Sequence, residues 1–142
     1  MEKNKDIKEV LREELEWEML RINKGRRVRA LVVRPGCLPE ERWVNTDGDT
    51  LWGIVGGPIE HAPLDGEYLV LVCCEVGKVL GYPPNRALFH EGAERPYDII
   101  AGTFLVMKED LWLEDYVDLT DGEVDEYKKI FEDPVCRWGY RL

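Results

Sequence analysis

The spacing of apolar residues divides the chain into a helical start and a strand-rich remainder. Between residues 6 and 23, apolar side chains recur every three or four positions, which is the repeat of one helix face. These side chains are Ile7, Val10, Leu11, Leu15, Met19 and Ile22. Further along, short β-branched runs end at turn residues, beginning with 28–33 before Pro35. We therefore expect an N-terminal helical extension, 1–24, ahead of a single domain, 25–142.

The strand-rich part predicts a sheet with one strand deep inside it. The segment 68–74 is apolar at every position, which is typical of a strand covered on both faces. The segment 59–63 is an expected edge strand, because its terminal proline cannot donate to a neighbouring strand. Further strands are expected at 42–44 and at 98–106, the second with Gly102 in its interior.

Two more helices are predicted from their polar caps. Asp47 or Asp49 is placed to cap a helix over 51–55. Thr120 and Glu123 have the spacing of a capping box at the start of a final helix. The predicted fold class is α+β, a small and mostly antiparallel sheet packed with two or three helices.

Composition and charge narrow the classes of partner. The chain has 142 residues, 44% of them hydrophobic, which suits one globular domain with an ordinary core. It carries 29 acidic residues against 19 Lys and Arg, a net charge of −10. This charge opposes sequence-independent binding to nucleic acid and to anionic membrane surfaces. The segment 21–29, with five Lys and Arg and no acidic residue, still allows a basic patch that contacts an anion near the first strand. Eleven acidic residues fall in 109–133. Solvated helix faces are the expected explanation, and any acidic binding surface would have to lie in this C-terminal quarter.

The distribution of apolar residues also bears on location and assembly. No stretch is apolar enough to span a membrane, and the first residues lack the apolar segment of a secretory signal. We therefore expect no membrane partner and a cytoplasmic location. The amphipathic segment 6–23 is a candidate for forming a homo-oligomer, since its apolar face needs a partner surface.

Four short motifs occur in a characteristic order along the chain. They are VGGPIE at 55–60, PPNRAL at 83–88, DIIAGTF at 98–104 and LTD at 119–121. In this combination the chain resembles, over about residues 28–133, the family called domain of unknown function 3846. The resemblance implies an accessory protein of bacteriophages or mobile elements that acts in the cytoplasm of the host cell. It implies no activity, because the family name assigns none.

The segment 83–86, which begins with two prolines, is the main candidate for a ligand site. Two prolines predict a stiff, irregular loop over 81–86, which presents side chains at little entropic cost. Asn85 supplies a donor and an acceptor, and Arg86 supplies a planar fork suited to phosphate or carboxylate. In the alternative interpretation, both side chains hold the loop to backbone carbonyls or to an internal carboxylate such as Asp98.

Four further residues complete the candidate ligand site. Gly102, within an apolar strand, would let a ligand approach the backbone, and Thr103 would add a hydroxyl. Tyr82 and Trp52 would stack on a planar ligand such as a base. Packing in the core or at an interface is the alternative role for both aromatic residues.

No pattern of a catalytic, metal or cofactor site stands out, so the sequence favours a non-enzymatic role without metal or cofactor. His61 has no obvious partner, and the thiols of Cys73 and Cys74 would point to opposite faces of a strand. Two functions remain. One is counter-defence by binding and sequestering a small nucleotide-like host signal through Arg86. The other is an acidic inhibitor or adaptor that targets a basic host protein.

Overall fold

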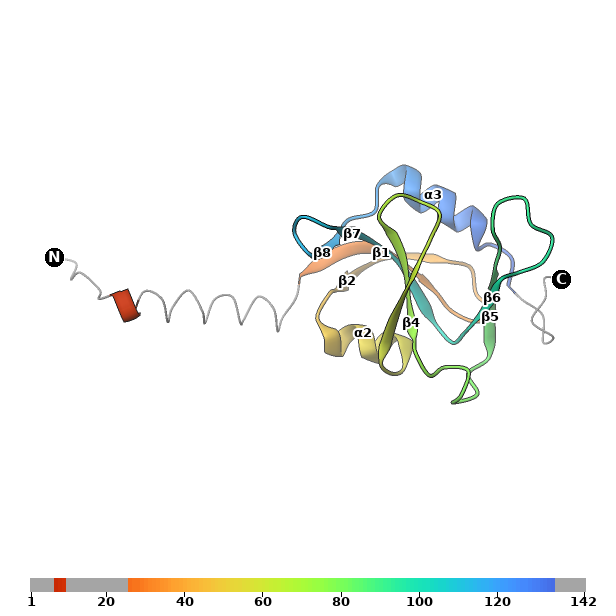
Figure 1. Cartoon of the computed structure of the whole chain (residues 1–142), viewed down its shortest axis with the longest axis horizontal. Helices are drawn as coiled ribbons and strands as arrows, with labels where there is room; N and C mark the ends of the chain where they lie inside the picture. The colour runs from red at the N-terminus through yellow and green to blue at the C-terminus, as the bar shows by residue number, and fades with distance from the viewer. Residues whose placement is uncertain (1–6, 10–25, 135–142) are drawn as a thin grey trace.

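A six-stranded antiparallel sheet forms the centre of the protein in the computed structural model, which describes residues 7–9 and 26–134 (Figure 1). The strands lie in the order β2, β1, β7, β4, β3, and β8 pairs with the end of β7. Their bounds are β1 Arg27–Val33, β2 Glu40–Asn45, β3 Ile59–Pro63, β4 Leu69–Cys74, β7 Phe104–Asp110 and β8 Asp115–Val117. A second sheet consists of β5 (Pro84–Leu88) and β6 (Asp98–Ala101).

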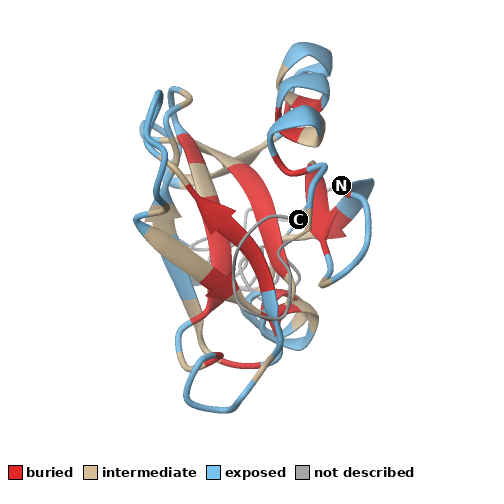
Figure 2. Ribbon diagram, turned by 90° about the vertical axis from the view of Figure 1, so that its right-hand side faces the viewer, coloured by how far each residue is buried: buried red, intermediate tan, exposed pale blue. Residues whose placement is uncertain are grey.

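Both faces of the main sheet are covered. Helix α2 (Gly48–Val55) packs on one face, whereas α3 (Asp121–Ile130) and the β5–β6 sheet pack on the other. Successive residues of β1 alternate accordingly, with Ala30 and Val32 in the α2 core and Leu31 and Val33 in the α3 core. Figure 2 shows the central strands as buried along most of their length.

Strand β4 confirms the prediction of a strand that is buried on both faces. Leu71 and Cys73 belong to the core under α3, and Val72 and Cys74 belong to the core under α2. The two adjacent thiols therefore point to opposite faces, as alternation along a strand requires. Burial raises the pKa of the Cys73 thiol to about 11, so this side chain stays protonated and behaves as an apolar residue.

The helix caps agree with the sequence. The Asp47 side chain accepts a hydrogen bond from Thr50 N at 2.7 Å, and α2 ends at Gly56 in the left-handed region (φ +83°). Thr120 and Glu123 form both halves of the capping box that starts α3. The predicted α+β class with a mostly antiparallel sheet is thus the observed one.

Two predictions for the second half of the chain were wrong. The irregular loop predicted over 81–86 is confined to 81–83, because β5 begins at Pro84 and its register with β6 shifts between Pro84 and Arg86. Proline is tolerated at the first position of a strand and at a bulge, where its missing N–H is not needed. The segment 98–106 is not one strand, because the backbone turns at Gly102 (φ +83°) and passes from β6 into β7 of the main sheet.

The predicted N-terminal extension lies largely outside the described residues. Of the segment 6–23, the structure describes only residues 7–9, which are helical. Within the described part of the chain, no helix has the length and apolar character needed to cross a membrane.

Candidate functional site

The side chain of Asn85 is buried and joins three strand ends. Its Nδ2 donates to Val33 O and to Gly102 O, both at 2.8 Å. Its Oδ1 accepts from Arg86 Nη1 at 2.7 Å. Val33 ends β1 and Gly102 lies between β6 and β7, so one amide fixes the β5–β6 sheet to the ends of two interior strands of the main sheet.

The Arg86 guanidinium is only 1% exposed and donates to backbone oxygens from three segments. Nε donates to Phe131 O at 2.7 Å, Nη2 to Cys37 O at 2.5 Å and Nη1 to Asn85 O at 3.0 Å. Phe131 caps the C-terminus of α3, where carbonyls without helical partners favour a cation. Burial lowers the pKa of Arg86, and these acceptors replace the water that the charge has lost.

Asn85, Arg86 and the backbone oxygens that they hold form a structural unit, which we call the Asn85–Arg86 cluster. Its contacts match the alternative in which both side chains hold the loop to backbone carbonyls. Asp98, the carboxylate considered as a partner, instead pairs with Lys78 at 2.6 Å between Oδ1 and Nζ. Because both side chains are buried, neither is placed to contact a ligand from the surface.

The other four predicted residues do not gather around an open cavity either. The Tyr82 hydroxyl donates to Gly56 O at 2.6 Å. The Tyr82 ring packs against Gly102, where an added Cβ would lie 2.9 Å from ring carbon Cδ2. Thr103 is half-buried. Trp52 is 53% exposed, but it lies on α2, on the opposite face of the main sheet from the Asn85–Arg86 cluster.

A different hollow is open to solvent, and we call it the α3 groove. It has a volume of about 520 Å³, within the range of ligand pockets. It lies between the C-terminal half of α3, the segment that follows β5, and the turn before β4. Its lining residues are Leu64, Asp65, Gly66, Ala87, Leu88, Phe89, His90, Glu91, Tyr97, Glu126, Tyr127, Ile130 and Phe131.

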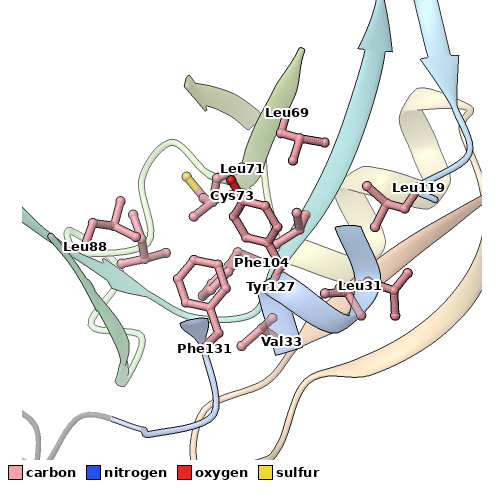
Figure 3. Packing of buried hydrophobic residues seen from close by; sticks show 13 residues of the cluster. Leu31, Val33, Leu69, Leu71, Cys73, Leu88, Phe104, Leu119, Tyr127 and Phe131 are labelled. Carbon is pink, nitrogen blue, oxygen red and sulfur yellow. The ribbon is translucent and has the colours of Figure 1, made fainter. Parts of the chain in front are cut away.

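The floor of the α3 groove is part of the apolar core. Leu88, Tyr127 and Phe131 are at most 4% exposed, and Tyr127 and Phe131 extend from α3 and its C-cap into the core that includes Leu88 (Figure 3). The Tyr127 hydroxyl accepts a hydrogen bond from Gly66 N at 3.0 Å, which fixes the turn before β4 against the helix. An added Cβ at Gly66 would lie 2.5 Å from Leu69 Cδ1 and 2.8 Å from that hydroxyl, so these side chains would have to shift to admit it. The groove is therefore attached to the core on both the turn side and the helix side.

The charges of the α3 groove all have one sign. Asp65, Glu91 and Glu126 line it, and none of them forms an ion pair with another residue among 26–134. The lining within this described range includes no Lys or Arg. Unpaired carboxylates beside a partly apolar surface attract cations and repel phosphate.

An aromatic pair forms one wall of the α3 groove. The rings of His90 and Tyr97 stack with their centroids 4.1 Å apart and their planes 15° from parallel. Tyr97 N donates to Leu88 O at 2.8 Å, which closes the loop that carries His90. Burial, with the charges of Asp65 and Asp98, raises the pKa of Tyr97. A neutral phenol ring that is 48% exposed can accept a cation on its face.

The structure also brings together His61, Tyr116 and Glu109. His61 Nε2 shares a short hydrogen bond with the Tyr116 hydroxyl and lies 3.8 Å from Glu109 Oε1. Burial raises the pKa of Tyr116 to about 12, so the hydroxyl stays protonated at neutral pH. This group gives His61 the partners that the sequence did not reveal. The neutral phenol can act as a hydrogen-bond donor but not as a nucleophile at neutral pH.

Comparison with known proteins now bears on identity. A family model described as Domain of unknown function (DUF3846) matches residues 28–132. The chain belongs to this family. No curated protein and no solved structure matches this chain.

The DUF3846 match coincides with the folded unit described above. It begins in β1 and ends just after α3, so it includes the Asn85–Arg86 cluster and the whole lining of the α3 groove. Both features therefore lie within the DUF3846 domain of this chain.

Sequence reasoning missed the α3 groove because its lining is scattered. Asp65, Glu91 and Glu126 come from three separate segments, and no local motif joins them. The only available signal was the concentration of acidic residues in 109–133, which includes Glu126 but neither of the others.

Proposed function

We propose that this DUF3846 protein is a non-enzymatic binding protein, an inhibitor or adaptor that takes a basic segment of another protein into the α3 groove. The observation that carries this proposal is a set of three carboxylates around an apolar, aromatic hollow, none of which has an ion-pair partner among residues 26–134. A Lys or Arg side chain would place its stem against Ile130 and Tyr97 and its charge beside Glu126.

We also propose a biological context and a partner for this binding function. The family resemblance to phage and mobile-element proteins suggests an accessory role, in which the partner is a basic protein in the host cytoplasm. The net charge of −10 supports a basic partner, because long-range attraction would speed encounter at low salt.

The alternative, sequestration of a nucleotide-like signal, has less support. It requires exposed cations, whereas Arg86 is buried and holds backbone carbonyls. The α3 groove presents carboxylates, which repel phosphate groups.

A titration with defined peptides tests the proposed function. The full chain is titrated by calorimetry with a lysine- and arginine-containing peptide of about eight residues, and with a glutamate peptide of equal length. We expect binding of the basic peptide only, with weaker affinity as salt rises. The double variant Asp65→Asn, Glu126→Gln is expected to lose about tenfold in affinity, by analogy with desolvated charge pairs.

A matched control separates the groove from general acidity. Asp125 is an exposed neighbour of Glu126 on α3 and does not line the groove, so Asp125→Asn should bind like the unmodified chain. Equal losses in both variants would show that only the overall charge matters. Binding of cyclic dinucleotides or ADP-ribose derivatives, without binding of the basic peptide, would instead support the nucleotide function.

A further inference from the structure

The hairpin between β7 and β8 exposes three consecutive large apolar side chains at its tip. Leu111 is 64% exposed, Trp112 is 96% exposed and Leu113 is 63% exposed. We call these three residues the LWL tip. A soluble surface rarely presents adjacent large apolar residues unless they contact something, because each exposes apolar area to water.

The backbone of the LWL tip is held in place. Asp110 Oδ1 accepts hydrogen bonds from Trp112 N at 2.9 Å and from Leu113 N at 3.1 Å. Asp110 and Asp115 are paired across the hairpin, so the loop between them has a fixed length of four residues. The conformation is thus set by the hairpin itself, and binding would cost little ordering of the backbone.

The charges around the tip restrict what can bind it. Glu109, Asp110, Glu114 and Asp115 flank the three apolar residues, and the segment 109–115 contains no Lys or Arg. Arg26 pairs with Asp115 at 3.6 Å, which leaves the other three carboxylates to set the charge around the tip. Carboxylates at this position are repelled by an anionic membrane surface and by nucleic acid. They would also repel the same tip of a second copy. A protein surface with an apolar pocket would bury the three apolar side chains, and a basic rim around that pocket would pair with the flanking carboxylates.

The geometry points to the LWL tip as a second docking surface, in which Trp112 inserts into an apolar pocket of a protein partner whose rim carries Lys or Arg. Tryptophan is the residue type most often found at the energetic centre of protein interfaces. This inference goes beyond the proposed function, because none of the residues that line the α3 groove belongs to the hairpin.

Site-specific crosslinking in the native cell tests the tip directly. The full chain carries a benzophenone amino acid at position 112 and is produced in the cells that encode it. We expect one major protein adduct after illumination, mapped by mass spectrometry to apolar residues flanked by Lys or Arg. With Leu111→Ser and Leu113→Ser added, the adduct should fall about tenfold or more, as for the loss of interface anchors. Glu114→Lys should lower it as well.

The matched control carries the same probe at Val79, a turn position outside the hairpin that is 86% exposed. It should not give this adduct. The purified partner should bind the full chain at least about tenfold more tightly than it binds Trp112→Ser. The thermal unfolding midpoint of this variant should be unchanged, because the side chain is almost fully exposed.

Several outcomes would overturn the inference. These are no adduct at position 112, the same adducts from positions 79 and 112, adducts formed mainly with lipid or with a second copy, and a purified partner that binds Trp112→Ser equally well. The α3 groove variants are a separate test, since they alter peptide binding without touching the hairpin.

Discussion

The Asn85–Arg86 cluster and the α3 groove lie on the same face of the main sheet, but their charged groups have different surroundings. Arg86 is buried, and its guanidinium donates to backbone carbonyls from three segments. The carboxylates of the groove are open to solvent and have no ion-pair partner among the described residues. A buried charge with filled contacts supports the fold, whereas an unpaired charge in a hollow remains available for a ligand.

The largest expected effect is the loss of protein stability when the Asn85–Arg86 cluster is disrupted. Arg86→Met should lower the free energy of unfolding by about 3–5 kcal/mol, because it leaves several buried carbonyl groups without donors. Chemical denaturation measures this loss. Arg95→Met is the control, since Arg95 is exposed, and should change stability by less than about 0.5 kcal/mol. Equal losses in the two variants would mean that the cluster does not support the fold.

Gly102→Ala tests the turn that the cluster holds. Position 102 has φ +83°, and an added Cβ would lie 2.9 Å from the Tyr82 ring. We expect a loss of about 2–3 kcal/mol from backbone strain and steric overlap together. Gly92→Ala isolates the strain, because Gly92 has φ +76° with nothing within 4 Å of an added Cβ. If both variants lose the same amount, the contact with Tyr82 contributes nothing.

Thr120→Ala tests the helix that forms one side of the α3 groove. The Thr120 side chain accepts from Glu123 N, so its removal should cost about 1 kcal/mol in thermal or chemical unfolding. Thr120→Ser keeps the hydroxyl and should recover most of this loss. Failure of the serine variant to recover stability would point to the methyl group rather than the cap.

The same cap predicts a dependence of stability on pH. Burial would raise the pKa of Glu123, but hydrogen bonds from Thr120 and Lys108 lower it below its ordinary value of 4.5. The ionised form is therefore favoured by folding, so its contribution is present above pH 4.5 and is lost as the pH falls further. Unfolding measured from pH 6 to pH 3 should show a shallower decline for Glu123→Gln. Parallel curves for the two proteins would exclude this contribution.

The smallest expected effect on protein stability comes from a substitution in the α3 groove. Glu126→Gln should change the free energy of unfolding by less than about 0.5 kcal/mol, because Glu126 is exposed and forms no ion pair with any residue of 26–134. The same variant should weaken binding of the basic peptide. A large loss of stability would mean that the carboxylate supports the fold, and the contrast with Arg86 would disappear.

Local patterns in the sequence determined most of the elements. The apolar run of β4, the caps at Asp47 and Thr120, and the turn at Gly56 each depend on neighbouring residues, so the printed sequence was enough to predict them. The three-residue strand β8 was missed, because it pairs only with the end of β7 and has too few residues for a periodic pattern. Proline at 84 was misinterpreted, because a strand can begin at a residue that lacks an N–H.

The sequence by itself determined the α+β class, the family and the acidic character. It also singled out Asn85 and Arg86 as side chains whose hydrogen bonds hold either a ligand or the backbone. Only the tertiary structure decided whether these two side chains face a ligand or the interior, since their acceptors come from β1 and from segments near Cys37, Gly102 and Phe131. It also decided which of the many carboxylates share a hollow. Burial and ion pairing depend on contacts between distant segments, and no local pattern in the chain encodes those contacts.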